Sequence, residues 1–162
     1  MLKKLLQELG HKGSPRIYLL HGSMNRHEMN SLYKHPKIKC LVSATRGEGF
    51  GLPMLEASVA GLPVIATDWS SHTEFLNKGR WIKIDYDLVP ISAERVDNNI
   101  FMEGARWAEL KENSFKKVVR KFYKSPHIPE QWAQELSQKL SETHSIKSVM
   151  HEYDKILSEV LG

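Results

Sequence analysis

The sequence predicts an α/β fold, in which a doubly wound parallel sheet is followed by a helical C-terminal tail. Short apolar runs that suit strands alternate with helix-like segments over residues 1–87. Several of these runs are continuously apolar, as expected for parallel strands that are covered on both faces. Beyond residue 87 the alternation stops. The 162 residues therefore suit one domain, with an α/β core over 1–87, an irregular segment over 88–110 and a helical tail over 111–162.

Local patterns predict each element of the core. Four apolar runs are expected as strands, at 16–21, 38–44, 62–67 and 80–85. Leucines at helical spacing predict a helix over 2–9, and Asn25 is a candidate N-cap for a helix that runs through Tyr33. A third helix is expected to start near Pro53 and to end at Gly61. Ser71 and Glu74 have capping-box spacing for a short helix, 72–77.

The segment after the core lacks the alternation of strand-like and helix-like stretches. Residues 88–110 indicate a long loop with a short helix. Apolar residues at helical spacing then predict three helices, at about 111–124, 129–142 and 145–161. These helices are interpreted as packing elements.

Composition and charge limit the possible functions. Apolar residues make up 41% and charged residues 26%, which is typical of a globular chain. The only cysteine, Cys40, lies in an apolar run and is expected to be a reduced core residue, which fits a cytoplasmic location. No apolar run approaches the roughly 20 residues of a membrane span. The net charge of +4 suits an anionic ligand or peripheral contact with an anionic membrane, and is too mild and scattered to indicate nucleic-acid binding.

A glycine-rich loop follows the predicted strand at 38–44. Gly47, Gly49 and Gly51 occupy alternate positions and lead into the helix near Pro53. Such a loop exposes backbone N–H groups, and the following helix adds a positive dipole end. Ligands of open parallel sheets bind at this edge, so a phosphate group is the expected ligand. The spacing matches neither the dinucleotide fingerprint G-x-G-x-x-G nor the Walker loop.

Two glutamates accompany this loop. Glu48 lies within it, where a carboxylate would repel a phosphate unless it serves another part of the ligand. Glu56 is expected in the first turn of the following helix, where the helix dipole alone could explain it. The functional interpretation is that both carboxylates accept hydrogen bonds from hydroxyl groups on either side of a diphosphate. A nucleotide sugar has that chemistry.

The stretch "GEGFGLPMLEASVAGLPVIATD" resembles the signature of retaining glycosyltransferases of family four, which have the GT-B architecture. The family's Glu-x7-Glu pair is matched by Glu48 and Glu56. The flanking stretches "IYLLHGSMNRHEMNSLY" and "TDWSSHTEFL" agree, so the resemblance extends over 17–84 and is weak in the helical tail. The resemblance implies that the chain is the Rossmann-like C-terminal half of a GT-B enzyme. It also implies transfer of a hexosyl group from a nucleotide-diphosphate sugar, with retention of configuration, in the synthesis of cell-surface polysaccharides.

The resemblance also implies roles for individual residues. Glu48 would contact the donor sugar near the reacting carbon as the catalytic carboxylate, and Glu56 would accept hydrogen bonds from the ribose. The backbone N–H groups that face the sugar and the diphosphate would be those of Gly49, Phe50, Gly51 and Leu52. Arg46 would help to neutralise the diphosphate, or would be a solvated loop residue. The base would be bordered by His21, Gly22 and Met24. No metal and no further cofactor are expected.

One departure from the family pattern limits this expectation. The family's donor half begins with one more strand and a loop whose Arg and Lys clamp the diphosphate, whereas this sequence begins inside the helix after that loop, at "MLKKLLQELG". The acceptor-binding half, with its catalytic histidine, also has no counterpart. The expected partners are a nucleotide-sugar donor and, through the other half, a saccharide or lipid-linked acceptor. The chain alone is expected to be inactive, and the last helix is expected to expose an apolar face, with weak self-association.

Several alternatives stay open. The chain could be a non-catalytic nucleotide-binding or protein-interaction module that keeps the fold, or more distantly a GT-B-like epimerase. Asp85-x-Asp87 is similar to a metal motif of another glycosyltransferase fold, although a polar strand end is the favoured interpretation. His72 is interpreted as a surface residue. Glu74 could face the ligand or cap its helix. Trp107 is interpreted as a core anchor rather than as a wall beside the site.

Overall fold

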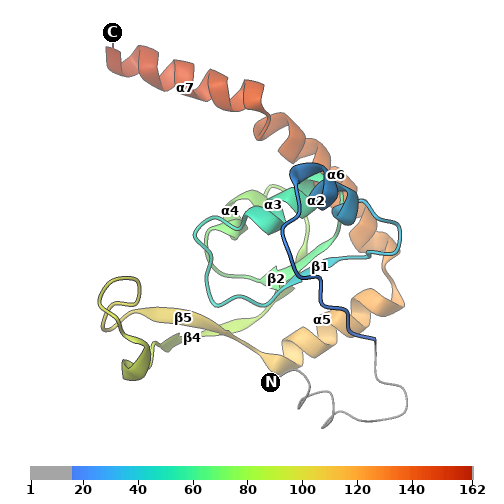
Figure 1. Ribbon diagram of the computed structural model, residues 1–162, viewed down its shortest axis with the longest axis vertical. Coiled ribbons are helices and arrows are strands. Elements are labelled where there is room, and N and C mark those ends of the chain that lie inside the picture. Colours follow the sequence, from blue (N-terminus) through green and yellow to red (C-terminus); the bar gives the residue numbers. More distant parts are fainter. Residues whose placement is uncertain (1–15, 162) are drawn as a thin grey trace.

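The structure, a computed structural model, describes residues 16–161, and its centre is a three-stranded parallel sheet (Figure 1). The strands are β1 (Leu41–Ser43), β2 (Val64–Thr67) and β3 (Ile82–Ile84), in the order β1-β2-β3. Ile65 of β2 is aligned with Val42 of β1 and with Ile82 of β3. Every residue of β2 is buried, as its continuous apolar run predicts.

Helices cover both faces of this sheet, which confirms the predicted fold class. On one face, Val64 and Ala66 join a core cluster that also receives side chains from α2 (Arg26–Tyr33), α3 (Leu52–Val59), α4 (His72–Leu76) and α6 (His127–Thr143). On the other face, Ile65 and Ile84 pack with Phe122 of α5 (Glu112–Lys124). Neighbouring residues of one strand therefore enter different cores, as the pleat of a strand requires.

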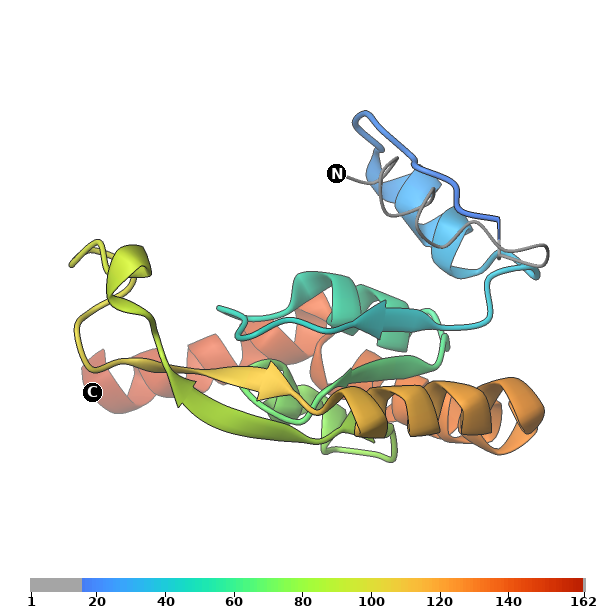
Figure 2. The ribbon, with the colours of Figure 1, turned by 90° about the horizontal axis from the view of Figure 1, so that it is seen from below.

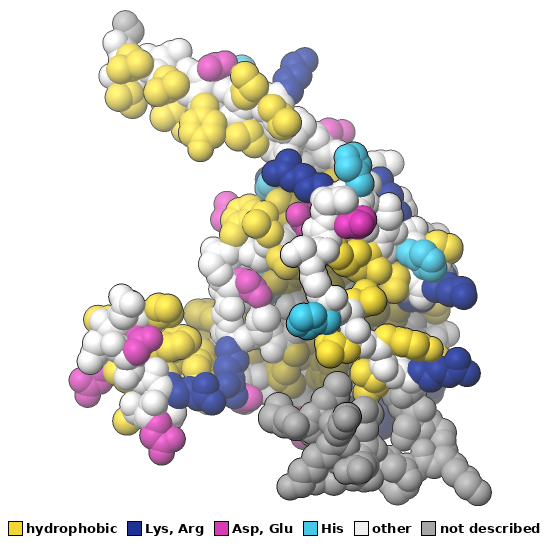
Figure 3. Space-filling model, in the orientation of Figure 1, with side chains coloured by type: hydrophobic (Ala, Val, Ile, Leu, Met, Phe, Trp, Pro, Cys, Tyr) yellow, Lys and Arg dark blue, Asp and Glu magenta, His cyan; other side chains and the backbone are white. Residues whose placement is uncertain are grey.

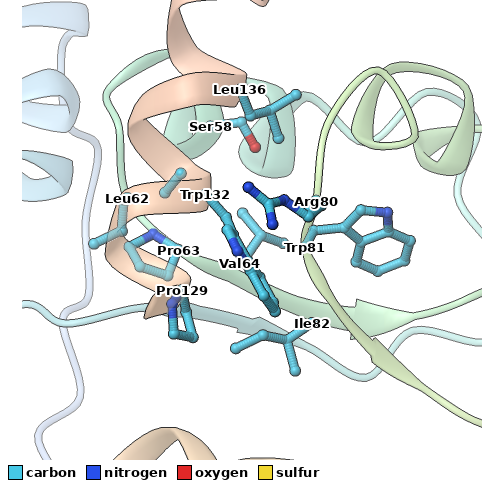
Figure 4. Close-up of a pocket in the computed structure, with 11 residues that line it drawn as sticks. Ser58, Leu62, Pro63, Val64, Arg80, Trp81, Ile82, Pro129, Trp132 and Leu136 are labelled. Atoms are coloured by element: carbon cyan, nitrogen blue, oxygen red, sulfur yellow. The ribbon is translucent and has the colours of Figure 1, made fainter. Parts of the chain in front are cut away.

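Helix α6 lies across the first of these faces. Figure 4 shows its residues Pro129, Trp132 and Leu136 together with residues of the sheet and of α3, including Val64 and Ser58. The Ser58 hydroxyl is fully buried there and has no hydrogen-bond partner. At the edge of this contact the Arg80 guanidinium lies 5.2 Å from the Trp132 ring and forms an ion pair with Glu135 at 2.9 Å.

Residues 88–110 are not the long loop that was expected. They contribute to an antiparallel hairpin of β4 (Tyr86–Pro90) and β5 (Arg106–Leu110), with a short 3-10 helix, η1 (Ala93–Arg95), in the connection. The hairpin projects from the body of the protein (Figures 1 and 2). The expected short helix is present, but the two strands were missed because a connection of this length carries no two-residue turn signal.

The strand expected at 16–21 is also absent. Residues 16–20 pair with no strand in the described part of the chain, and Ile17 and Leu20 are 52% and 71% exposed. Strand β1 instead forms one edge of the sheet. Apolar character alone does not make a strand, since the ladder needs a hydrogen-bonded neighbour. The helix expected at 2–9 lies outside the described residues.

The helical tail is confirmed as α5, α6 and α7 (Ile146–Leu161). The expected apolar face of α7 is exposed, as Figure 3 shows. Its exposed residues are Ile146, Val149, Met150, Tyr153, Ile156, Leu157, Val160 and Leu161. Within residues 16–161, no helix is long and apolar enough to cross a membrane.

Candidate functional site

The glycine loop connects the carboxyl end of β1 to the first turn of α3. Gly51 is the N-cap of α3 and has a φ of +88°, which is the left-handed region. A Cβ atom at this position would lie 2.9 Å from the His72 Cβ and 3.0 Å from the Met54 Cε. Glycine is therefore required here for both its conformation and its size, and the loop is held tightly against α4.

Several backbone donors at the end of this loop have no partner among the described residues. No side chain caps α3, and the Met54 and Leu55 N–H groups donate to the Gly51 carbonyl at 2.9 and 3.1 Å. Among the described residues, no acceptor is recorded for four successive N–H groups, those of Gly49, Phe50, Gly51 and Leu52. Unpartnered N–H groups at a helix start form an environment that favours an anion.

Two serines hold the backbone of Glu48. The Glu48 N–H donates to the Ser70 Oγ at 2.8 Å, and the Glu48 carbonyl accepts from both the Ser70 and Ser71 hydroxyls at 2.8 Å. Ser70 itself has a φ of +91°, an uncommon conformation for a residue with a side chain. The Glu48 carboxylate has no hydrogen bond or ion pair within the described part of the chain. The loop therefore fixes the main chain of Glu48 and leaves its carboxylate available.

This arrangement corrects the expected capping box at Ser71. The Ser71 side chain makes no cap hydrogen bond to α4, because Ser71 itself has helical backbone angles, with φ −58° and ψ −32°, rather than the extended angles of an N-cap; its hydroxyl donates to the Glu48 carbonyl. Glu74 is exposed on α4, and its charge acts on His144 at the end of α6. The role of the two serines was not predicted, and no local sequence signal indicates it.

Glu56 lies one turn into α3 rather than in its first turn, because the helix begins at Leu52. Its carboxylate is close to the Tyr33 hydroxyl of α2. The pKa of Tyr33 is raised by burial first and then by the negative charge of Glu56. The effect of the helix dipole is weaker at this position than in the first turn. The dipole alone is therefore a poorer explanation for a carboxylate at position 56. Glu56 therefore occupies the space between α3 and α2.

The three residues expected to border a base precede α2. His21, Gly22 and Met24 are all exposed in the segment that leads into this helix. The space around Gly22 is open, with no atom within 4 Å of an added Cβ. A role for these residues next to a base stays a prediction.

Arg46 is bound to the hairpin rather than free in the loop. Its guanidinium forms an ion pair with Glu109 at 2.7 Å and lies 4.4 Å from the Trp107 ring centroid. The Arg46 carbonyl also accepts from the Ala108 N–H at 3.0 Å. Contact between Arg46 and a diphosphate stays a prediction, and would have to compete with Glu109.

Trp107 is not the core anchor that was expected. It is half-buried and lines an open hollow beside the glycine loop, together with Arg46, Trp69 and Phe101. The edge of Phe101 faces the Trp107 ring at 5.9 Å between centroids. The alternative interpretation, a wall beside the site, describes its position.

His72 is fully buried, so its interpretation as a surface residue is wrong. It begins α4 directly beneath Gly51, and its Nε2 lies 2.7 Å from the Thr67 carbonyl. Since a carbonyl only accepts, Nε2 must carry a proton. The other ring nitrogen, Nδ1, is buried without a partner. A neutral ring is the form that suits this site, because a second N–H would leave an unsatisfied buried donor.

The two aspartates after β3 serve the hairpin and α5. Asp87 forms an ion pair with Lys111 at 2.9 Å, and the Asp85 carbonyl accepts from the Lys111 N–H at 2.8 Å. In the part of the chain that the structure describes, no group of three or more His, Cys, Asp or Glu side chains is placed to hold a metal ion. Metal-independent binding stays an expectation.

Comparisons with known proteins identify the family. The glycosyl transferases group 1 family matches residues 1–87. A curated relative, the sucrose synthase of the bacterium Melioribacter roseus, is 29% identical over 82 residues, which is 46% of this chain and 10% of that protein. The chain thus spans about a tenth of the relative's length. No solved structure matches significantly. Because the family match covers more than half of the chain, the protein belongs to the group 1 glycosyl transferases.

Proposed function

We propose that this chain is the donor-binding half of a retaining glycosyltransferase and binds a nucleoside-diphosphate sugar at the loop 45–52. The observation that carries the proposal is the run of unpartnered N–H groups at the start of α3, next to the available Glu48 carboxylate. The group 1 family match, which includes this loop, supports the same function.

In the proposed reaction the bond between the anomeric carbon and the diphosphate oxygen breaks, and its electron pair stays on the diphosphate. A hydroxyl oxygen of the acceptor forms the new bond on the same face, and its proton leaves with the diphosphate. The N–H groups of the loop and the α3 dipole stabilise the charge that develops on the leaving group. Glu48 accepts hydrogen bonds from the sugar hydroxyls, and Glu56 accepts them from the ribose.

We further propose that turnover requires an acceptor-binding half beyond these 162 residues. Positioning an acceptor against the anomeric carbon supplies a large part of the rate of such a transfer. The exposed apolar face of α7 suits a contact with that half. A radiolabelled-donor assay with the chain alone should give no appreciable transfer, and robust turnover that is lost in Glu48→Ala would contradict this.

A calorimetric titration with uridine, guanosine and adenosine diphosphates, each with and without a sugar, tests the site. Glu56→Gln should weaken binding of the preferred diphosphate about 10-fold or more, since a hydrogen bond to a charged group contributes about 1.5–3 kcal/mol. Glu48→Gln should mainly reduce the preference for the sugar-bearing form. Glu94→Gln, an equal change of charge in the hairpin connection, is the control. Affinities that are the same in all four proteins would remove the assignment.

The same α7 face supports a second candidate, a protein-interaction module that keeps the fold without the chemistry. The two are separated by the titration. A module without donor chemistry would bind none of the diphosphates, while still binding a protein partner through α7.

A further inference from the structure

Helix α5 has a large excess of positive charge. Helix α5 contains one carboxylate, Glu112, and five cationic side chains, Lys116, Lys117, Arg120, Lys121 and Lys124. Its net charge of +4 equals that of the entire 162-residue chain. An excess of this size on a single helix of 13 residues favours a partner of opposite charge.

These cations share one face of α5. The opposite face is apolar and packs on the sheet through Phe115, Val118 and Phe122. Lys117 is three and four residues before Arg120 and Lys121, and Lys124 is four and three residues after them, which places all four on one stripe of the helix. All four are exposed, and none has an ion-pair partner among the described residues, whereas Lys116 is paired with Glu112.

An apolar hollow adjoins this stripe. It lies between α5, the start of α6 and β3, has a volume of about 310 Å³, and includes Lys121 in its lining. Its apolar lining consists of Trp81, Ile82, Val118, Phe122, Ile128, Pro129 and Trp132. Ile128 is 44% exposed. Cations, aromatic rings and exposed apolar side chains thus occur together on one surface.

We propose that this surface, the basic stripe of α5 with the hollow beside it, binds the surface of an anionic lipid bilayer. The cations suit lipid phosphate groups, and the apolar side chains suit the boundary between head groups and acyl chains, where Trp and Tyr are enriched. Nucleic acid fits less well, because the hollow is mainly apolar and, of its three aromatic side chains, only Trp132 is not buried and could stack on a base. The surface is separate from the donor site and does not depend on the proposed function.

Vesicle co-sedimentation tests the proposal, using phosphatidylcholine vesicles with and without phosphatidylglycerol. The protein should bind only the anionic vesicles, and molar salt should release it. The quadruple variant Lys117→Gln, Arg120→Gln, Lys121→Gln and Lys124→Gln should bind far more weakly. Each cation near an anionic surface contributes about fivefold to partitioning, so a loss of at least about 25-fold is expected even if only two of the four reach the surface.

A matched variant distinguishes the effect of this local surface from the effect of the protein's overall charge. It removes the same charge from four exposed positions elsewhere, through Lys34→Gln, Lys37→Gln, Lys39→Gln and Lys147→Gln. This control should keep most of the vesicle binding, and Ile128→Ser in the otherwise unchanged protein should weaken it. Circular dichroism checks that each variant is folded.

Three outcomes would overturn the proposal. The two quadruple variants could lose binding equally, the folded protein could ignore anionic vesicles, or it could bind a single-stranded oligonucleotide in preference to them. Glu48→Gln and Glu56→Gln should bind vesicles normally, so failure of the donor site and failure of this surface are distinguishable.

Discussion

Gly51→Ala should destabilise the protein strongly, because two costs coincide at this position. The left-handed backbone, with a φ of +88°, costs a residue with a Cβ about 1–2 kcal/mol. The new Cβ would also meet the His72 Cβ at 2.9 Å and the Met54 Cε at 3.0 Å. The end of the methionine side chain can move, but the His72 Cβ is fixed by a fully buried ring. Overpacking of this kind costs about 1–3 kcal/mol.

The combined loss is therefore about 2–5 kcal/mol. In a domain of this size that corresponds to a fall in Tm of roughly 4–20 °C. Gly49→Ala in the same loop is the matched control, since its added Cβ would meet no atom within 4 Å and its φ is not positive. That variant should change the stability by no more than about 1 kcal/mol.

Differential scanning calorimetry of the three proteins measures the stability, and titration with the preferred nucleoside diphosphate measures the site. Below its Tm, Gly51→Ala should also bind the diphosphate more weakly, because the displaced loop moves the four N–H groups that face the anion. Equal Tm values for the two alanine variants would refute the argument that Gly51 is fixed by conformation and packing against α4.

Three further predictions concern packing, pH and metals. Ser58→Ala should raise the stability by about 1–2 kcal/mol, because it removes a buried hydroxyl without a partner and improves helix propensity; an unchanged or lower Tm would contradict this. The pKa of His144 is lowered, chiefly by burial and then by Lys78. The folded protein thus binds a proton on His144 less tightly than the unfolded chain does. The contribution of His144 to stability should be fully present above about pH 6.5 and should be lost as the pH drops through the folded pKa. In a series of Tm measurements at different pH values, His144→Gln should reduce this loss of stability. Titration with the diphosphate in the presence of a chelator should give an unchanged affinity. A metal site would be established instead if the chelator weakened binding, if manganese restored it, and if Asp85→Asn removed the effect of manganese.

The parallel sheet and the long helices could be predicted because their signals are local. A continuous apolar run marks β2, and Asn25 caps α2 as expected, in a capping box with Glu28. The failures all involve partners distant in the sequence. Residues 16–20 have apolar character but no neighbouring strand, and the pairing of Leu88 with Ala108 crosses a long connection. A pattern within one segment carries no information on which other segment will pair with it.

The candidate site shows the same division between local and distant signals. The glycines and glutamates that indicated the phosphate loop all lie within one short stretch of the sequence. The contact of Arg46 with Glu109 and Trp107 could not be found from that stretch, because it joins the loop to β5. Arg46 is a charged loop residue next to a predicted anion site and was therefore assigned to the ligand. In the structure its guanidinium instead forms an ion pair within the protein.

Ser71 shows most clearly how tertiary structure overrides a local motif. The spacing of Ser71 with Glu74 predicts that the Ser71 hydroxyl oxygen accepts from a backbone N–H group in the first turn of α4. In the fold, the turn after β2 lies against the loop after β1, and the Glu48 carbonyl there accepts from both Ser71 and Ser70. A capping interaction contributes about 1 kcal/mol to one helix. The two bonds to Glu48 instead connect the turns that follow two neighbouring strands, and so fix the backbone of the residue on which the proposed chemistry depends.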